Sequence, residues 1–212
     1  MEQNKTKQNL TAKILILGDS SVGKSSILMR YTDNTFATNM TTTVGIDYKL
    51  KKIKVDDVEL KLQIWDTAGQ EKYRSLAQNY YKNSMGVLLV FDVTEEDTFD
   101  NVRNWVRQIK NHAGENICKV LLANKADLTE ERVIQSEQIL ELAADVNMQA
   151  FECSAKTGLN IEQAFLYLAR EIKKKFFPYA TGSSDATVAK PEGKKLRAHD
   201  DEDGISKTKC GC

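Results

Sequence analysis

The chain of 212 residues lacks a long apolar run and any net charge, since Lys+Arg and Asp+Glu are both 30. Its longest apolar run, residues 85–91, is too short to span a bilayer. The first nine residues are polar and lack the apolar core of a signal peptide. The balanced charge gives no sign of a general nucleic-acid binder. We therefore expect a cytosolic protein that does not bind nucleic acid.

Proline is also scarce, with two residues in the chain, and the first of them marks a boundary. After Pro178 almost no apolar residues occur, so that segment cannot bury enough surface to order itself. An apolar content of 41% is enough for one sizeable core. We predict a flexible N-terminus (1–10), one domain (11–177) and a disordered tail (178–212).

Cysteine is limited to four residues. Cys118 and Cys153 lie in apolar, strand-like runs, and we predict that both are buried thiols, because disulfides are rare in the cytosol. The other two, Cys210 and Cys212, lie at the end of the tail.

Short apolar runs of strand length alternate with segments of helical period. The expected strands are residues 13–17, 46–55, 58–65, 87–92, 119–123 and 149–153. The expected helices start near residue 26, cover 99–112 and 134–146, and start again at residue 161. Asp56 and Asp57 form a turn, so the second and third strands pair as a hairpin. The pattern predicts an α/β fold with a six-stranded, mostly parallel sheet, one antiparallel strand and helices on both faces.

Helical spacing also predicts which side chains face the core. For the helix over residues 134–146 these are Ile139, Leu140, Leu142 and Ala143. For the last helix they are Ile161, Ala164, Phe165, Leu168 and Ile172. We expect Asn160 and Gln163 to cap the start of the last helix. Trp105 and Phe165 are assigned to the core rather than to a cofactor.

Residues 18–25, Gly-Asp-Ser-Ser-Val-Gly-Lys-Ser, fit the phosphate-binding pattern G-x-x-x-x-G-K-[ST] between a strand and a helix. Backbone N–H groups and the helix N-terminus would face phosphate oxygens. Lys24 would reach the β- and γ-phosphates, and Ser25 would bind Mg²⁺. The expected phosphate contacts are Ser20, Ser21, Val22, Gly23, Lys24, Ser25 and Ser26. The motif indicates a nucleoside triphosphate without naming its base.

A second motif, residues 65–71, follows the third strand. Asp66 is placed to contact Mg²⁺ directly or through water. Gly69 has no Cβ, so its N–H can approach the γ-phosphate. Gln70 can both accept from and donate to an attacking water, which makes it the candidate catalytic residue.

Two further segments follow the fifth and sixth strands and point to guanine. Asp127, in Asn124-Lys125-Ala126-Asp127, can accept hydrogen bonds from guanine N1–H and the 2-amino group. Adenine would leave that carboxylate unpaired, at a cost of about 1–3 kcal/mol or more. In residues 154–156, Ser-Ala-Lys, a backbone N–H can donate to guanine O6 and Lys156 can pack over the base. The expected guanine contacts are Phe36, Asn124, Lys125, Asp127, Ser154, Ala155 and Lys156.

The order and spacing of these motifs resemble the small Ras-like GTPases over roughly residues 10–177, and more closely the Rab family. The segments similar to Rab signatures are residues 44–48, 61–65, 73–76, 80–82 and 90–94. Tyr48 stands where Phe is usual, residues 82–84 depart from Arg-Gly-Ala, and Ala123 stands where Gly is common. None of these departures touches the expected chemistry.

The resemblance implies further roles. Thr43 would bind Mg²⁺ and the γ-phosphate only in the GTP state, and Phe36 would lie against the guanine. Tyr48, Trp65 and Tyr80 would form the aromatic triad that effectors read. The expected effector contacts are Val44, Gly45, Ile46, Tyr48, Trp65 and Tyr80. GTP would order the switch segments (33–46 and 67–81), and hydrolysis would release them.

None of the motifs contains an arginine that would stabilise the transition state of hydrolysis. We expect a monomeric switch with slow intrinsic hydrolysis, accelerated about 10³–10⁵-fold by a GTPase-activating protein. The resemblance also implies a nucleotide exchange factor, a GDP-dissociation inhibitor and effectors in vesicle-mediated transport.

Cys210-Gly211-Cys212 resembles the doubly prenylated terminus of Rab proteins, which implies a prenylation escort protein and a prenyltransferase. Two lipids are needed for stable anchoring, and the tail has no net positive charge to assist. We therefore expect the protein at the cytoplasmic face of a membrane, cycling with the cytosol. The alternative is a redox or metal pair, but two thiols without a further ligand cannot complete a zinc site.

Two other functions remain open from the sequence. A scaffold that binds GTP or GDP without useful turnover is disfavoured because Ser25, Thr43 and Gln70 are present. A phosphotransferase with a phosphate-binding loop would need arginines over the phosphates and would not need Asn124 and Asp127.

Overall fold

The computed structural model describes residues 10–38, 46–67, 81–114 and 116–180. The strands are β1 (Leu10–Leu17), β2 (Ile46–Val55), β3 (Val58–Thr67), β4 (Gly86–Asp92), β5 (Cys118–Asn124) and β6 (Gln149–Glu152). The helices are α1 (Lys24–Asp33), α3 (Glu96–Asp100), α4 (Val102–His112), α5 (Ser136–Asp145) and α6 (Ile161–Phe176). Among the described residues, no helix combines the length and apolarity needed to cross a membrane.

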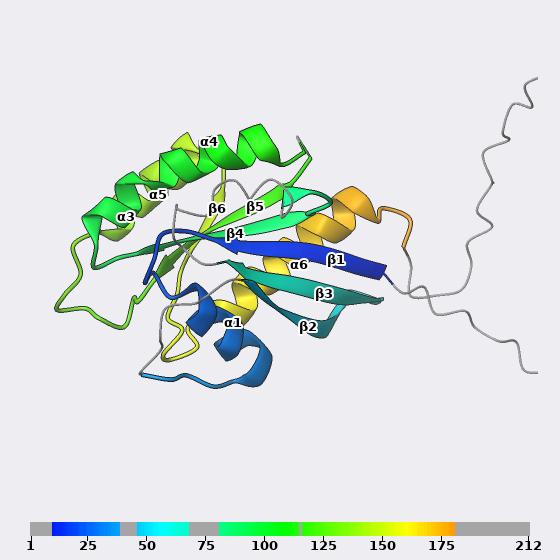
Figure 1. Cartoon of the computed structure of the whole chain (residues 1–212), viewed down its shortest axis with the longest axis horizontal. Coiled ribbons are helices and arrows are strands. Elements are labelled where there is room, and N and C mark those ends of the chain that lie inside the picture. The colour runs from blue at the N-terminus through cyan, green and yellow to red at the C-terminus, as the bar shows by residue number, and fades with distance from the viewer. Residues whose placement is uncertain (1–9, 39–45, 68–80, 115, 181–212) are drawn as a thin grey trace, which may run out of the picture.

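The six strands form one sheet in the order β2-β3-β1-β4-β5-β6. β2 runs antiparallel to β3 and the other neighbours pair in parallel, which confirms the predicted fold class. Helices α1 and α6 cover one face, and α3, α4 and α5 cover the other (Figure 1). The register pairs Asp92 with Asn124, so the carboxyl ends of β4 and β5 meet at one edge of the sheet.

Each face of the sheet has its own apolar core. Beneath α1 and α6, Tyr31 stacks on the fully buried Phe165 with ring centroids 3.7 Å apart. All the α6 residues predicted to face inward are buried, because they recur at the period of the helix. Cys118 and Cys153 are buried as predicted.

Three local predictions were wrong. Leu140 is 66% exposed, because Ile139, Leu142 and Ala143 form the buried stripe and Leu140 lies about 100° away from Ile139 around the helix. Asn160 occupies the N-cap position of α6, but its side chain makes no capping hydrogen bond, and its amide donates instead to the Glu152 carbonyl at 2.7 Å. The helix expected over residues 99–112 is divided between α3 and α4.

Candidate nucleotide-binding site

The phosphate loop, residues 18–25, turns sharply after β1. Gly18, Ser21 and Gly23 have φ values of 141°, 63° and 96°, a region of backbone conformation that favours glycine. A Cβ on Gly18 would lie 2.1 Å from the Val90 carbonyl oxygen, and one on Gly23 would lie 2.4 Å from Asn124 Nδ2. The two glycines therefore let the loop lie directly on the ends of β4 and β5.

Lys24 begins α1 and is 5% exposed. Its ammonium group donates to the carbonyls of Gly18 at 2.9 Å and Asp19 at 2.5 Å. Burial lowers the pKa of Lys24 to about 8, while the nearby carboxylates of Asp66 and Asp19 favour its charged form. A phosphate in the loop would add a further negative charge and favour the ammonium form more strongly.

Ser25 and Asp66 bring two oxygen ligands together. The Ser25 hydroxyl, at the start of α1, donates to Oδ2 of Asp66, near the end of β3. The Asp66 side chain is buried. A hydroxyl and a carboxylate beside a phosphate-binding loop are the donor types that Mg²⁺ takes, so these residues fit that ion.

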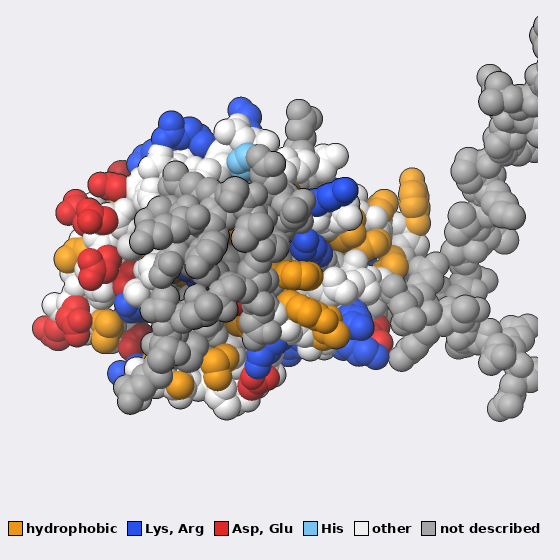
Figure 2. All heavy atoms as spheres, viewed as in Figure 1, with side chains coloured by type: hydrophobic (Ala, Val, Ile, Leu, Met, Phe, Trp, Pro, Cys, Tyr) orange, Lys and Arg blue, Asp and Glu red, His pale blue; other side chains and the backbone are white. Residues whose placement is uncertain are grey.

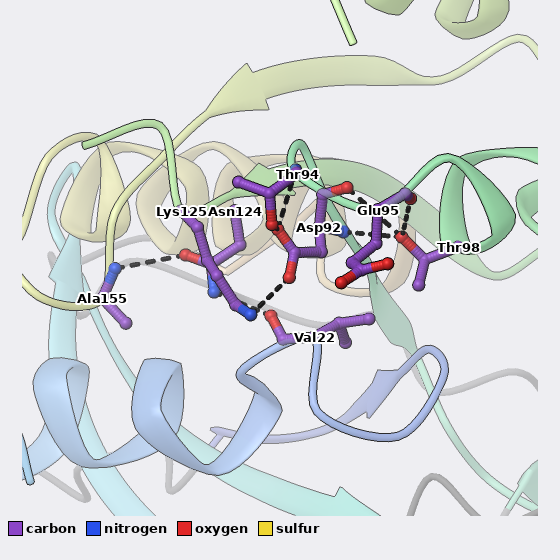
Figure 3. A network of polar contacts seen from close by, with 8 residues as sticks. All are labelled: Val22, Asp92, Thr94, Glu95, Thr98, Asn124, Lys125 and Ala155. Atoms are coloured by element: carbon purple, nitrogen blue, oxygen red, sulfur yellow. Dashed lines mark hydrogen bonds and ion pairs between the residues drawn. The ribbon is translucent and has the colours of Figure 1, made fainter. Parts of the chain in front are cut away.

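Asn124, buried at the end of β5, joins three segments of the chain (Figure 3). Its Nδ2 donates to the Val22 carbonyl in the phosphate loop at 2.8 Å. Its Oδ1 accepts the N–H of Ala155, in the loop between β6 and α6, at 3.2 Å. One amide therefore fixes the phosphate loop relative to the β6–α6 loop.

The carboxylate of Asp127 is held in place from the β6–α6 loop. Ser154 Oγ donates to its Oδ1 at 2.6 Å, and Lys156 Nζ lies 3.8 Å from its Oδ2. Ser154 Oγ in turn accepts the N–H of Thr157 at 3.0 Å. The Asp127 side chain is 14% exposed, so it is a fixed, partly accessible acceptor.

Asp92 forms a second buried polar centre, at the end of β4 (Figure 3). Its Oδ1 accepts from the N–H and the hydroxyl of Thr94 at 2.9 and 2.8 Å. Its Oδ2 forms an ion pair with Lys125, which has a positive φ of 65°. Asp92 therefore fixes the side chain of Lys125 beside the phosphate loop.

A model of the Ras family matches residues 13–174 of this chain. The chain belongs to the Ras family, in its Rab group. It is 44% identical to the Ras-related protein RABE1d of Arabidopsis thaliana over 189 residues, which cover 89% of this chain and 85% of the relative. It is 47% identical to the GTP-binding protein ypt2 of Schizosaccharomyces pombe over 162 residues, 76% of this chain and 81% of that protein.

The Ras-related protein Rab-8B of Dictyostelium discoideum is 42% identical over 183 residues, which cover 86% of this chain and 90% of the relative. As a Rab protein, the chain binds GTP and GDP and hydrolyses GTP. This agrees with the arrangement of the phosphate loop, Asn124 and Asp127.

Sequence reasoning missed several residues of this Rab site. Asp92 ends a fully buried strand, so the rule that identified Asp66 could have found it. The Asp19 carboxylate points toward α4, where it accepts from Asn101 Nδ2 at 2.7 Å and from Trp105 Nε1 at 2.9 Å. Trp105 thus packs at the core, as predicted, and also holds the phosphate loop.

The other predicted site residues are Phe36, Ile46 and a group that the structure does not describe. Phe36 is half-buried against the core beneath α1 and α6. Ile46 begins β2. The residues outside the described part of the chain are Thr43, Val44, Gly45, Gly69, Gln70, Tyr80, Cys210 and Cys212.

The face of β2 and β3 not covered by α1 carries an aromatic pair. Tyr48 stacks on Trp65 with ring centroids 5.0 Å apart, and Tyr48 is 52% exposed. Figure 2 shows exposed apolar side chains over β2 and β3, with lysine and arginine side chains around them. Strand β2 itself contains Lys49, Lys51, Lys52 and Lys54.

Proposed function

We propose that this Rab protein is a GTP-driven switch that recruits effectors to a membrane in vesicle-mediated transport, through a domain that spans residues 11–177. The contacts of Asn124 carry the proposal, since one buried amide fixes the phosphate loop and the β6–α6 loop in a single geometry. The family of the chain and its Rab relatives support the trafficking role.

The phosphate loop would bind the nucleotide through its backbone N–H groups and through Lys24. Residues 20–26 supply these groups. Ser25 and Asp66, with Thr43, would hold Mg²⁺, which when bound neutralises negative charge on the β- and γ-phosphates. The hydrogen bond between Ser25 and Asp66 supports this assignment, because it shows that their oxygens reach the same point.

Asp127 would select guanine by accepting from N1–H and the 2-amino group. The contact from Ser154 supports this role, since it holds the carboxylate in one orientation. Backbone N–H groups of the β6–α6 loop would face O6. Phe36, Lys125 and Lys156 would pack around the base.

Switching would depend on residues outside the described part of the chain. Thr43 and Gly69 would contact the γ-phosphate, and Gln70 would orient the attacking water. Hydrolysis would break these contacts and release both switch segments. Intrinsic turnover would be slow, and a GTPase-activating protein would accelerate it about 10³–10⁵-fold.

Membrane attachment would use two prenyl groups on Cys210 and Cys212, at the end of the tail (residues 178–212). A prenylation escort protein, a prenyltransferase and a GDP-dissociation inhibitor would serve this step, and an exchange factor would load GTP at the cytoplasmic face of the membrane. Effectors would read residues 44–46 and the aromatic residues Tyr48, Trp65 and Tyr80. The exposed stack of Tyr48 on Trp65 supports that surface.

Base selection gives the most direct test of the proposal. In Asp127→Asn one carboxylate oxygen becomes an NH₂ group, which can donate to the 2-oxo group of xanthine. The side chain can then no longer accept from N1–H and the 2-amino group of guanine together. We expect the preference for GDP over xanthosine diphosphate to reverse in a competition assay with fluorescent GDP. The exposed Asp97→Asn should keep the wild-type preference. An unchanged preference in Asp127→Asn would contradict the assignment of the base site.

Single-turnover GTP hydrolysis with Mg²⁺ tests the catalytic assignment. The wild-type protein should turn over slowly, Gln70→Leu should be slower still, and ATP should not compete. Tight GTP binding without any turnover in the wild-type protein would favour a nucleotide-bound scaffold instead.

A further inference from the structure

Arg30 lies on α1 six residues after Lys24 and reaches the β6–α6 loop with its guanidinium group. Its Nε donates to the Ala155 carbonyl at 2.8 Å, and its Nη2 donates to the Lys156 carbonyl at 2.7 Å. Its Nη1 donates to Oδ1 of Asn34 at 3.0 Å and to the Asn34 carbonyl at 3.2 Å. One side chain therefore joins α1, the residue that follows α1, and two consecutive carbonyls of the β6–α6 loop.

The geometry of these contacts requires arginine. A guanidinium group is planar and its N–H donors point in fixed directions, so it can serve two neighbouring carbonyls and a third partner at once. A lysine has a single nitrogen at its tip and cannot span them. The loop also passes close to the arginine stem, since a Cβ on Gly158 would lie 3.7 Å from Arg30 Cδ.

These contacts fix the direction of the backbone N–H groups in the β6–α6 loop. A trans peptide is planar, and its C=O and N–H point in opposite directions. Because the Ala155 carbonyl points at Arg30, the N–H of Lys156 points away from it. Asn124 holds the preceding N–H, that of Ala155. Arg30 and Asn124 together therefore orient both peptide units that lie nearest the proposed O6 of guanine.

We propose that Arg30 is a positioning residue that sets the residence time and the O6 selectivity of the bound guanine nucleotide. It does so by holding the β6–α6 loop to α1 and to Asn34. This inference rests on the proposed binding of guanine at the β6–α6 loop. None of the sequence motifs includes Arg30.

The contact with Asn34 adds a coupling between two parts of the site. Asn34 ends α1 in a left-handed conformation, with φ 54° and its N–H bonded to the Met29 carbonyl. Asn34 lies near the start of the first switch segment (33–46), two residues before Phe36. A partner that pulls this segment away from α1 would break the bonds between Arg30 and Asn34. The β6–α6 loop would then lose part of its support, and the base would leave faster.

The test measures dissociation of two nucleotides from the full-length protein with Mg²⁺. One is fluorescent GDP, and the other is the matching 6-thioguanosine diphosphate, which keeps N1–H and the 2-amino group but replaces O6 with sulfur. In Arg30→Met we expect GDP to leave about tenfold faster, which corresponds to about 1.4 kcal/mol. We also expect the preference for GDP over the thio analogue to shrink. The rate of GDP release from Arg30→Lys should lie between the rates of the wild type and Arg30→Met.

Arg103→Met is the matched control, because Arg103 is an exposed arginine that pairs with Asp145 on the far side of the sheet. It should behave as the wild type does. Asn34→Gly removes the side-chain acceptor and tolerates the left-handed φ of 54° at this position. It should accelerate GDP release about two- to threefold, so the inference can be tested even if Arg30→Met folds poorly.

Two results would overturn the inference. One is unchanged GDP release in both Arg30→Met and Asn34→Gly. The other is equal acceleration for GDP and the thio analogue together with a lower melting temperature, which would assign Arg30 to general stability. Failure of the wild-type protein to bind GDP would instead overturn the proposed function.

Discussion

The ammonium group of Lys24 bonds to carbonyls five and six residues away, whereas the amide of Asn124 bonds to groups 31 and 102 residues away. The phosphate half of the site is thus formed largely by one continuous loop, and the base half is assembled from separate ends of strands. A local loop can form its geometry from its own sequence, but an assembled half depends on the whole sheet. We therefore expect substitutions in the two halves to differ in their effects on stability and on GDP binding.

The largest effect should come from Gly18→Ala in the phosphate half. Gly18 has φ 141°, and a Cβ there would lie 2.1 Å from the Val90 carbonyl oxygen. We expect the free energy of unfolding to fall by about 2–4 kcal/mol, measured by urea denaturation, with loss of tight GDP binding. Gly114→Ala is the control, since no atom lies within 4 Å of its Cβ position. Similar stability losses in both variants would show that the close approach to β4 has no special role.

Asn124→Ala should have the next largest effect and should disturb both halves. The change leaves the Val22 carbonyl and the Ala155 N–H without this partner. Loss of buried hydrogen bonds costs about 1–3 kcal/mol, so we expect lower stability and a GDP dissociation constant about 10–100-fold higher. Asn111→Ala, at an exposed position of α4, should change neither quantity. Weaker GDP binding without any loss of stability would mean that the amide serves the ligand alone.

The base half also contains a buried thiol that makes stability depend on alkaline pH. Burial raises the pKa of the Cys153 thiol, whose sulfur lies 3.8 Å from Asn124 Oδ1. Above about pH 8.5 the unfolded thiol loses its proton while the folded one keeps it, so stability falls as pH rises. Cys153→Ala removes this dependence, and its stability deficit relative to the wild type should shrink by about 1–2 kcal/mol between pH 7 and pH 10. Urea denaturation at both pH values measures the deficit, and a constant deficit would contradict this prediction.

Ser154→Ala should give the smallest effect, confined to the base half. It removes the hydroxyl that holds Asp127 at 2.6 Å. We expect GDP to dissociate about three- to tenfold faster, for a lost hydrogen bond of about 0.5–1.5 kcal/mol, in a stopped-flow measurement with fluorescent GDP. Ser136→Ala, at the exposed start of α5, is the control. If both substitutions leave the rate unchanged, the orientation of Asp127 does not depend on Ser154.

The same division explains what the sequence could predict. The phosphate loop could be recognised because its glycines, Lys24 and Ser25 are close in sequence and lie between a strand and a helix. The strands and helices could also be predicted, because the spacing of apolar residues along the chain indicates which side chains are buried. Arg30 could not be assigned, since its partners Ala155 and Lys156 lie 125 and 126 residues away and only the folded sheet brings them near.

Leu140 shows a different kind of limit. Its run of apolar neighbours is wider than the stripe of α5 that the sheet can cover, so composition alone overstates its burial. Asn160 shows a third kind of limit. Its Oδ1 could accept a backbone N–H at the start of α6, but in the folded protein its Nδ2 donates to the Glu152 carbonyl and the side chain makes no capping hydrogen bond.

The lysines of β2 oppose aggregation of the protein through the edge of its sheet. Open sheet edges can pair with strands of other molecules and seed aggregation, and charged side chains, lysine above all, oppose such pairing. At one edge of this sheet, β2 carries exposed Lys52 and Lys54, and at the other, β6 spans only Gln149–Glu152. Neither edge offers a long, uncharged template. Copies of the protein at high local concentration can therefore lie close together without their sheets joining into fibres.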